Sequence, residues 1–312
     1  MPNSLVAGGA GLIGSRLCRR LLDSGHRVIC ADNLATATRA NLNGLSAEAG
    51  FEYIACDVTG EIEFGPVDNV FHLASPASPR HFSEIPEAII AANSSGTANL
   101  IELALERGAR FLFASTSEVY GDPLEHPQRE DYFGNVNPVG ERACYDESKR
   151  FGEALTMTAV RRRGLDGRIV RIFNTYGPGM NPDDGRALIE FLRRALEGRP
   201  LPIHGDGRQT RSWCYVEDLA EGIARAMELP GTCGRVYNLG NPEERSVLDL
   251  ASAVLAATGS DSSLEFLPLP PDDPVRRCPD ISRARAELGW EPRVELEDGL
   301  LKTLAWYRQE FT

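Results

Sequence analysis

The sequence lacks the features that mark disulfide-bonded, secreted and membrane-spanning proteins. Its seven cysteines are odd in number, lie far apart and form no Cys-x-x-Cys pair, so neither a disulfide framework nor a zinc site is indicated. No apolar run approaches the length that a membrane-spanning helix needs. The first residues show no basic segment followed by a cleavage site. These absences favour a protein of the reducing cytoplasm without a membrane partner.

Positive charge is also scarce. Lysine and arginine total 33 against 45 aspartates and glutamates, which gives a formal net charge of −12. A field of this sign repels polyanions and argues against nucleic acid as a partner. An anionic small ligand would therefore need arginines placed locally around it.

Short apolar runs alternate with longer amphipathic stretches through the first half of the chain. The short runs predict strands and the longer stretches predict helices. The predicted strands cover residues 4–7, 28–31, 51–55, 69–73, 111–114 and 168–172. The predicted helices cover residues 14–24, 86–107 and 144–163. This alternation predicts an α/β fold with a doubly wound parallel (Rossmann) sheet and helices on both faces.

A glycine-rich segment directly follows the first predicted strand. Gly8-Gly9-Ala10-Gly11-Leu12-Ile13-Gly14 has the spacing Gly-x-x-Gly-x-x-Gly and opens into an amphipathic helix. Glycines let the backbone approach a pyrophosphate, and the helix N-terminus presents N–H groups to negative charge. Flexible turns use the same residues, so the glycine-rich segment alone does not establish that the protein binds a dinucleotide. Asp32 ends the second strand about twenty residues later, where a carboxylate binds ribose hydroxyls and repels a 2′-phosphate, which favours NAD over NADP.

The second half of the chain is less regular and richer in glycine and proline. It predicts a helix over 187–197, a strand over 236–239 and a helix over 247–257. We expect an NAD-binding Rossmann domain over residues 1–175, with a later contribution from about 210–240. Residues 176–312 would mainly form a smaller C-terminal substrate-binding lobe. No linker is long enough to separate two independent domains.

Tyr145 and Lys149 lie four residues apart at the start of a predicted helix, so they share one helix face. A cationic lysine near a phenol stabilises the phenolate and lowers its pKa from about 10. The tyrosine could then act as a base toward a hydroxyl near neutral pH. Because helices also hold this spacing by chance, the pair gains weight only together with the glycine loop.

These motifs resemble the extended short-chain dehydrogenase/reductase family, which joins a glycine loop, a Tyr-x-x-x-Lys pair and a Ser/Thr-rich strand end. The strand end here is Ala114-Ser115-Thr116-Ser117-Glu118-Val119-Tyr120-Gly121. Within that family the chain is similar to the UDP-glucuronate decarboxylases. The matching segments are residues 72–79, 116–123, 137–138, 142–147, 171–175, 184–186, 209–211, 238–244 and 272–274. One departure is Ser148, where the family usually places glycine.

The resemblance implies a reaction in which oxidation makes decarboxylation easy. Tyr145 would remove the 4-hydroxyl proton of UDP-glucuronate while hydride passes from C4 to NAD. The resulting β-keto acid can lose carbon dioxide because its carbonyl accepts the electrons as an enolate. Reprotonation at C5 and return of the hydride would give UDP-xylose. The sequence leaves open whether some UDP-4-keto-xylose is released before that final reduction.

The resemblance also implies roles for individual residues. Thr116 would hydrogen-bond the 4-oxygen, Glu118 would position the sugar ring, and Arg211 would lie near the departing carboxylate or relay a proton. Glu118 could instead cap the following helix, and Arg211 could form a surface ion pair. The expected catalytic residues are Tyr145, Lys149, Thr116, Glu118 and Arg211. The expected NAD-binding residues are Gly8, Gly11, Leu12, Ile13, Gly14, Asp32, Asn33, Asp57, Val58, Leu73, Ala74, Ser75, Ala114, Tyr145 and Lys149. The expected substrate-binding residues are Asn174, Arg186, Arg211 and Arg277.

Two further classes of function remain as alternatives. A nucleotide-sugar 4,6-dehydratase or 4-epimerase would share the fold, although Ser117 stands where a dehydratase places its acidic aspartate. A non-catalytic NAD-binding sensor would need neither Tyr145 nor Lys149. The resemblance also implies a homodimer formed through the helices at 86–107 and 144–163, which could instead simply pack on the sheet.

Overall fold

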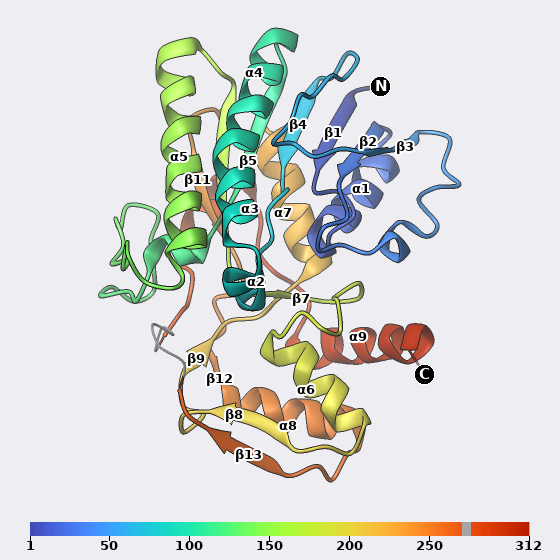
Figure 1. The fold of residues 1–312 in the computed structure, drawn as a ribbon, viewed down its shortest axis with the longest axis vertical. Coiled ribbons are helices and arrows are strands. Elements are labelled where there is room, and N and C mark those ends of the chain that lie inside the picture. The colour runs from blue at the N-terminus through green and yellow to red at the C-terminus, as the bar shows by residue number, and fades with distance from the viewer. Residues whose placement is uncertain (270–275, 312) are drawn as a thin grey trace.

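The structure is a computed structural model that describes residues 1–269 and 276–311, so the matching segment 272–274 lies outside it. At its centre is a parallel seven-stranded sheet with the order β11-β6-β5-β4-β1-β2-β3 (Figure 1). The strands are β1 (Asn3–Ala7), β2 (Arg27–Asp32), β3 (Phe51–Ala55), β4 (Asn69–His72), β5 (Arg110–Thr116), β6 (Gly167–Ile172) and β11 (Val236–Leu239). The predicted doubly wound parallel fold is confirmed.

Helices cover both faces of this sheet. The apolar sides of α1 (Leu12–Asp23) and α7 (Val216–Glu228) join one buried cluster with the sheet. Those of α4 (Thr97–Arg107) and α5 (Ala143–Arg163) join a second cluster on the opposite face (Figure 1). Each of these four helices therefore buries an apolar stripe against the sheet.

The single helix predicted over residues 86–107 is interrupted. After α2 (Pro79–Glu84), the segment divides into α3 (Pro86–Ala91), a π turn (Ala92–Gly96) and α4. Within the π turn, the buried Asn93 amide donates a hydrogen bond of 3.0 Å to the Ser148 hydroxyl on α5. A π turn admits one extra residue per turn, and here it directs a polar side chain toward the neighbouring helix.

The second lobe has its own buried cluster and lies below the sheet in Figure 1. Its helix α6 packs on α8, and its strands β8 and β13 pair in parallel. The lobe contains α6 (Ala187–Leu196), β8 (Leu201–His204), α8 (Val247–Thr258), β13 (Leu264–Leu267) and α9 (Leu296–Phe311). Short ladders connect it to the sheet domain, namely β7 (Thr175–Tyr176) with β10 (Cys214–Tyr215) and β9 (Thr210–Arg211) with β12 (Arg245–Ser246). Three short helices complete the chain, namely η1 (Arg39–Leu42), η3 (Ser117–Tyr120) and η4 (Ala284–Leu288).

The helices and the cysteines bear on two expectations from the sequence. Within the described parts of the chain, no helix combines the length and the apolar character that crossing a membrane requires. All seven cysteines carry free thiols. The packing of the sheet and of the lobe therefore rests on noncovalent contacts alone.

Candidate active site

A cavity of about 500 Å³ lies between the carboxyl edge of the sheet and the second lobe. The glycine-rich loop and the ends of β4, β5 and β6 form one wall. The start of α5, the segment before α6 and residues from β9 close the other sides. The loop expected to bind a nucleotide and the lobe expected to bind a substrate therefore face one continuous space, at the edge where parallel α/β sheets bind their ligands.

The glycine loop is packed too tightly for side chains at Gly8, Gly9 and Gly14. A Cβ atom on Gly8, whose φ is +81°, would lie 2.6 Å from the backbone nitrogen of Ala74. A Cβ atom on Gly14 would lie 2.1 Å from the carbonyl oxygen of Gly8. Gly11 lines the cavity just before α1, whose first-turn N–H groups have no partner within the helix. This bare backbone at a helix N-terminus fits the diphosphate of a dinucleotide.

Most of the predicted NAD-binding residues line the cavity. Those that do are Gly8, Gly11, Leu12, Ile13, Gly14, Leu73, Ser75, Ala114, Tyr145 and Lys149. The other predicted residues are not part of the cavity lining and are Asp32, Asn33, Asp57, Val58 and Ala74. The Asp32 carboxylate accepts hydrogen bonds from the backbone N–H groups of Ala10, at 2.9 Å, and Leu34, at 2.8 Å. Burial raises the pKa of Asp32, and these two hydrogen bonds oppose that shift.

Tyr145 and Lys149 lie together on the first turns of α5. The Lys149 ammonium is 5.9 Å from the centroid of the Tyr145 ring and donates a 2.8 Å hydrogen bond to the carbonyl of Ala114. Burial lowers the pKa of Lys149 to about 7. The Tyr145 ring stacks on the Phe82 ring with 5.1 Å between their centroids. Burial raises the pKa of Tyr145, and the hydrogen bond to Thr116 offsets only part of this rise. The expected lowering of the Tyr145 pKa by Lys149 is therefore absent from the chain alone, where burial sets the direction of the shift.

Glu118 is a buried anion held between two guanidinium groups. Arg277 donates a hydrogen bond to each of its carboxylate oxygens, and Arg142 donates another. Burial alone would raise the pKa of Glu118, but Arg277 and Arg142 bring it below its ordinary value. Glu118 does not act as a helix cap, since the Thr116 side chain caps η3 by accepting from the Glu118 N–H group. Arg277, expected to clamp the substrate, thus lines the cavity already paired with a carboxylate.

The remaining predicted substrate residues also line the cavity. The mostly buried Arg211 donates a 2.8 Å hydrogen bond to the carbonyl of Thr210. Arg186 pairs with the Asp184 carboxylate at 2.6 Å while 35% of its side chain stays exposed. Asn174 lines the cavity, and its backbone carbonyl accepts a hydrogen bond from the Cys214 N–H group. Arg186, Arg211 and Arg277 of the second lobe therefore all line the cavity.

Arg142 and Phe82 are among the cavity residues that were not identified from the sequence. Arg142 lies three residues before Tyr145, lines the cavity and bonds Glu118. Its guanidinium also lies 5.4 Å from the centroid of the Phe82 ring. The position of Arg142 three residues before Tyr145 could have indicated that it belongs to the site. No local pattern pointed to Phe82, since its contact with Tyr145 joins distant segments.

Comparison with known proteins decides the family. Residues 4–240 match the NAD dependent epimerase/dehydratase family. The chain belongs to this family. A UDP-glucuronic acid decarboxylase of Arabidopsis thaliana is 47% identical over 304 residues, which cover 97% of this chain and 69% of the relative. One of Danio rerio is 44% identical over 306 residues, which cover 98% of this chain and 72% of the relative.

Solved structures of family members show how closely the fold is shared. The UDP-glucuronic acid 4-epimerase of Bacillus cereus, in complex with UDP-glucuronic acid and NAD, is 30% identical with a TM-score of 0.90. The alignment covers 99% of this chain and 100% of the epimerase. Decarboxylases and epimerases thus share this family, so the fold alone does not choose the reaction. NAD is the cofactor, and the glycine loop described above suits its diphosphate.

Proposed function

We propose that the protein is an NAD-dependent carboxy-lyase that converts UDP-glucuronate to UDP-xylose through a UDP-4-keto intermediate. The observation that carries this proposal is that a single cavity holds the glycine loop, the Tyr145 and Lys149 pair and arginines of the second lobe. Such a site can oxidise a sugar hydroxyl beside an acidic group. The Arabidopsis thaliana and Danio rerio relatives, both UDP-glucuronic acid decarboxylases, match nearly the whole chain.

Tyr145 acts first, as the base that removes the proton of the sugar 4-hydroxyl. NAD, when bound, supplies the hydride acceptor and later the hydride donor at C4, and its positive nicotinamide favours a nearby phenolate. The Thr116 side chain forms a hydrogen bond with Tyr145, which places it beside the hydroxyl that Tyr145 deprotonates. Thr116 therefore hydrogen-bonds the 4-oxygen of the sugar. Lys149 is fixed by the Ala114 carbonyl and keeps its ammonium close to the tyrosine ring.

Decarboxylation follows from the ketone at C4. Glu118 positions the sugar ring, while Arg277 and Arg142 offset its negative charge. The ketone at C4 accepts the electron pair of the breaking bond, and the resulting enolate takes a proton at C5. Arg211 lies at the same cavity and orients the uronate, while Arg186 and Asn174 contact the sugar nucleotide.

Ser117 separates this reaction from dehydration. It lies at the start of η3, is buried and lines the cavity. A serine hydroxyl is a poor proton donor to a departing hydroxide, whereas loss of carbon dioxide needs no acid at that position.

Product analysis tests the proposal. The purified protein is supplied with NAD and, in separate reactions, UDP-glucuronate, UDP-glucose or dTDP-glucose. The products are separated by chromatography, which resolves C4 epimers, and are then identified by mass spectrometry. We expect a UDP-pentose from UDP-glucuronate and no product from the neutral sugars. Recovery of UDP-glucuronate as its C4 epimer, or turnover of a neutral sugar alone, would overturn the proposal. The mass of the pentose also distinguishes the 4-ketone from the alcohol.

We further propose that residues 1–175, with about 210–240, bind NAD and that residues 176–312 mainly bind the sugar nucleotide. The pairing of β11 with β6 in the central sheet supports this division. In the NAD-binding part, Asp32 and Asn33 would bind the adenosine ribose. Asp57 and Val58 would lie at the adenine.

A homodimer formed through α3, α4 and α5 is also proposed. Ile90 on α3 and Phe151 on α5 support it, because their side chains are 46% and 52% exposed on these helices. Light scattering of the purified protein measures its mass in solution.

Seven free thiols and the net charge of −12 support a reducing cytoplasm and the absence of nucleic acid partners.

A further inference from the structure

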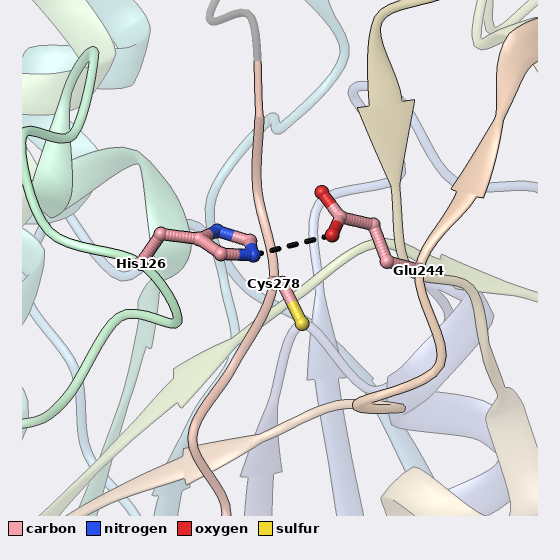
Figure 2. Close-up of side chains that lie close together, drawn as sticks. All are labelled: His126, Glu244 and Cys278. Atoms are coloured by element: carbon pink, nitrogen blue, oxygen red, sulfur yellow. Dashed lines mark ion pairs between the residues drawn. The ribbon is translucent and has the colours of Figure 1, made fainter.

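Three potential metal ligands converge at the junction of the two lobes. Figure 2 shows His126, Glu244 and Cys278, none of which lines the cavity. His126 follows η3, Glu244 lies between β11 and β12, and Cys278 precedes η4. One ligand atom from each residue lies within 4.8 Å of the other two. Within residues 1–269 and 276–311, this is the one group of three or more such side chains.

The separations suit a tetrahedral ion. Zinc–nitrogen and zinc–oxygen bonds of about 2.1 Å place two ligand atoms about 3.4 Å apart along a tetrahedral edge. Nε2 of His126 lies 3.2 Å from Oε2 of Glu244. A set of nitrogen, oxygen and sulfur favours zinc over magnesium or calcium, which prefer oxygen ligands. Three protein ligands leave one position for water, and the exposed His126 opens the site to solvent.

Arg276 shows that two of the ligand atoms already converge on a cation. Its Nη2 atom lies 2.8 Å from Nε2 of His126 and 2.9 Å from Oε2 of Glu244. Nε2 of His126 and Oε2 of Glu244 therefore face the same cationic group. The Arg276 side chain is 53% exposed, and such surface ion pairs contribute little stability. A metal ion could therefore replace the guanidinium at this point.

We propose that His126, Glu244 and Cys278 bind a zinc-class divalent transition metal ion in competition with Arg276. No zinc-type spacing is visible in the sequence, because the three ligands come from separate segments. Cys278 directly follows Arg277, and its backbone N–H group donates a 2.8 Å hydrogen bond to the buried Gln128 side chain. A bound ion would tie the segment around Cys278 to the segments that carry His126 and Glu244, and would stabilise the folded protein.

Cobalt provides the direct test, because a thiolate bound to Co²⁺ gives a charge-transfer absorption band that nitrogen and oxygen ligands do not. Tag-free, reduced, NAD-loaded protein is titrated with Co²⁺ and then with Zn²⁺, and Zn²⁺ affinity is measured against a chromophoric chelator. We expect one Co²⁺ per chain with the thiolate band, which Zn²⁺ abolishes, and a higher unfolding temperature with Zn²⁺. Cys278→Ser should lose the band, and His126→Ala should weaken Zn²⁺ binding by at least about tenfold.

Two further variants sharpen this experiment. Cys233→Ser is the matched control, since Cys233 is an exposed free cysteine elsewhere, and it should keep the band. Arg276→Ala should tighten Zn²⁺ binding because it removes the competing cation. The proposal is overturned if no ion binds, if the band survives in Cys278→Ser, or if Arg276→Ala leaves the affinity unchanged. This last variant alters an exposed side chain and decides the question even if a ligand variant fails to fold.

Discussion

Arg277 donates one hydrogen bond to each oxygen of the Glu118 carboxylate, although 159 positions separate the two residues in the chain. The contact joins the end of β5 to the second lobe across the cavity, and Arg142 closes the other side of the carboxylate. A carboxylate fixed between two guanidinium groups is therefore present before any substrate enters. In the proposed reaction, this carboxylate positions the sugar ring.

Glu118→Ala should lower both stability and turnover. Removing one partner of a buried ion pair leaves uncompensated charge, here two guanidinium groups, and costs about 3 kcal/mol or more in the free energy of unfolding. Urea unfolding measures the difference. Glu147→Ala is the matched control, because Glu147 pairs with Arg150 at the surface and should cost less than about 1 kcal/mol. Equal losses in the two variants would contradict the account of Glu118.

Tyr145→Phe should lower kcat by about 10² to 10⁴, because it removes the base while keeping the ring that stacks on Phe82. NAD binding should stay close to that of the unaltered protein, as measured by calorimetry. Tyr307→Phe, at another buried tyrosine in the second lobe, should keep the original kcat. A Tyr145→Phe protein with normal turnover would rule out the proposed base.

The free energy of unfolding of the NAD-free protein should rise with pH because of Lys149. Burial lowers its pKa to about 7 from an ordinary value of 10.5. Between these values the unfolded chain holds a proton that the folded protein has lost, so stability rises by up to about 1.4 kcal/mol per pH unit. Below pH 7 the full cost of burying the charge is present. Lys149→Met should flatten this slope in urea unfolding from pH 7 to 9.5, and an identical slope in both proteins would refute the prediction.

Asp32→Asn should reduce the preference for NAD over NADP by at least about tenfold, because it removes the charge that repels a 2′-phosphate. The asparagine oxygen can still accept from Ala10 or Leu34, so the loop should keep its conformation. Titration with both dinucleotides measures the ratio. Asp57→Asn is the control at the end of the adjacent strand, and an equal change in that variant would argue against the assignment of Asp32.

Local patterns predicted the sheet, the glycine loop and the Tyr145 and Lys149 pair, because strand alternation, close turns and helix spacing are encoded over short stretches of sequence. The contact of Glu118 with Arg277 could not be predicted, because it depends on how the second lobe folds back over the sheet. The same limit applies to the stacking of Phe82 on Tyr145. The direction of the Tyr145 pKa shift depends on burial, which spacing to a lysine does not report.

The fate of the carboxyl carbon tests the central claim most directly. UDP-glucuronate labelled with ¹³C at its carboxyl carbon is incubated with the protein and NAD, and the label is followed in the gas phase and in the nucleotide sugar. The account predicts that labelled carbon dioxide forms in equal amount to an unlabelled UDP-pentose. Label that remains in a six-carbon nucleotide sugar while the substrate is consumed would contradict it.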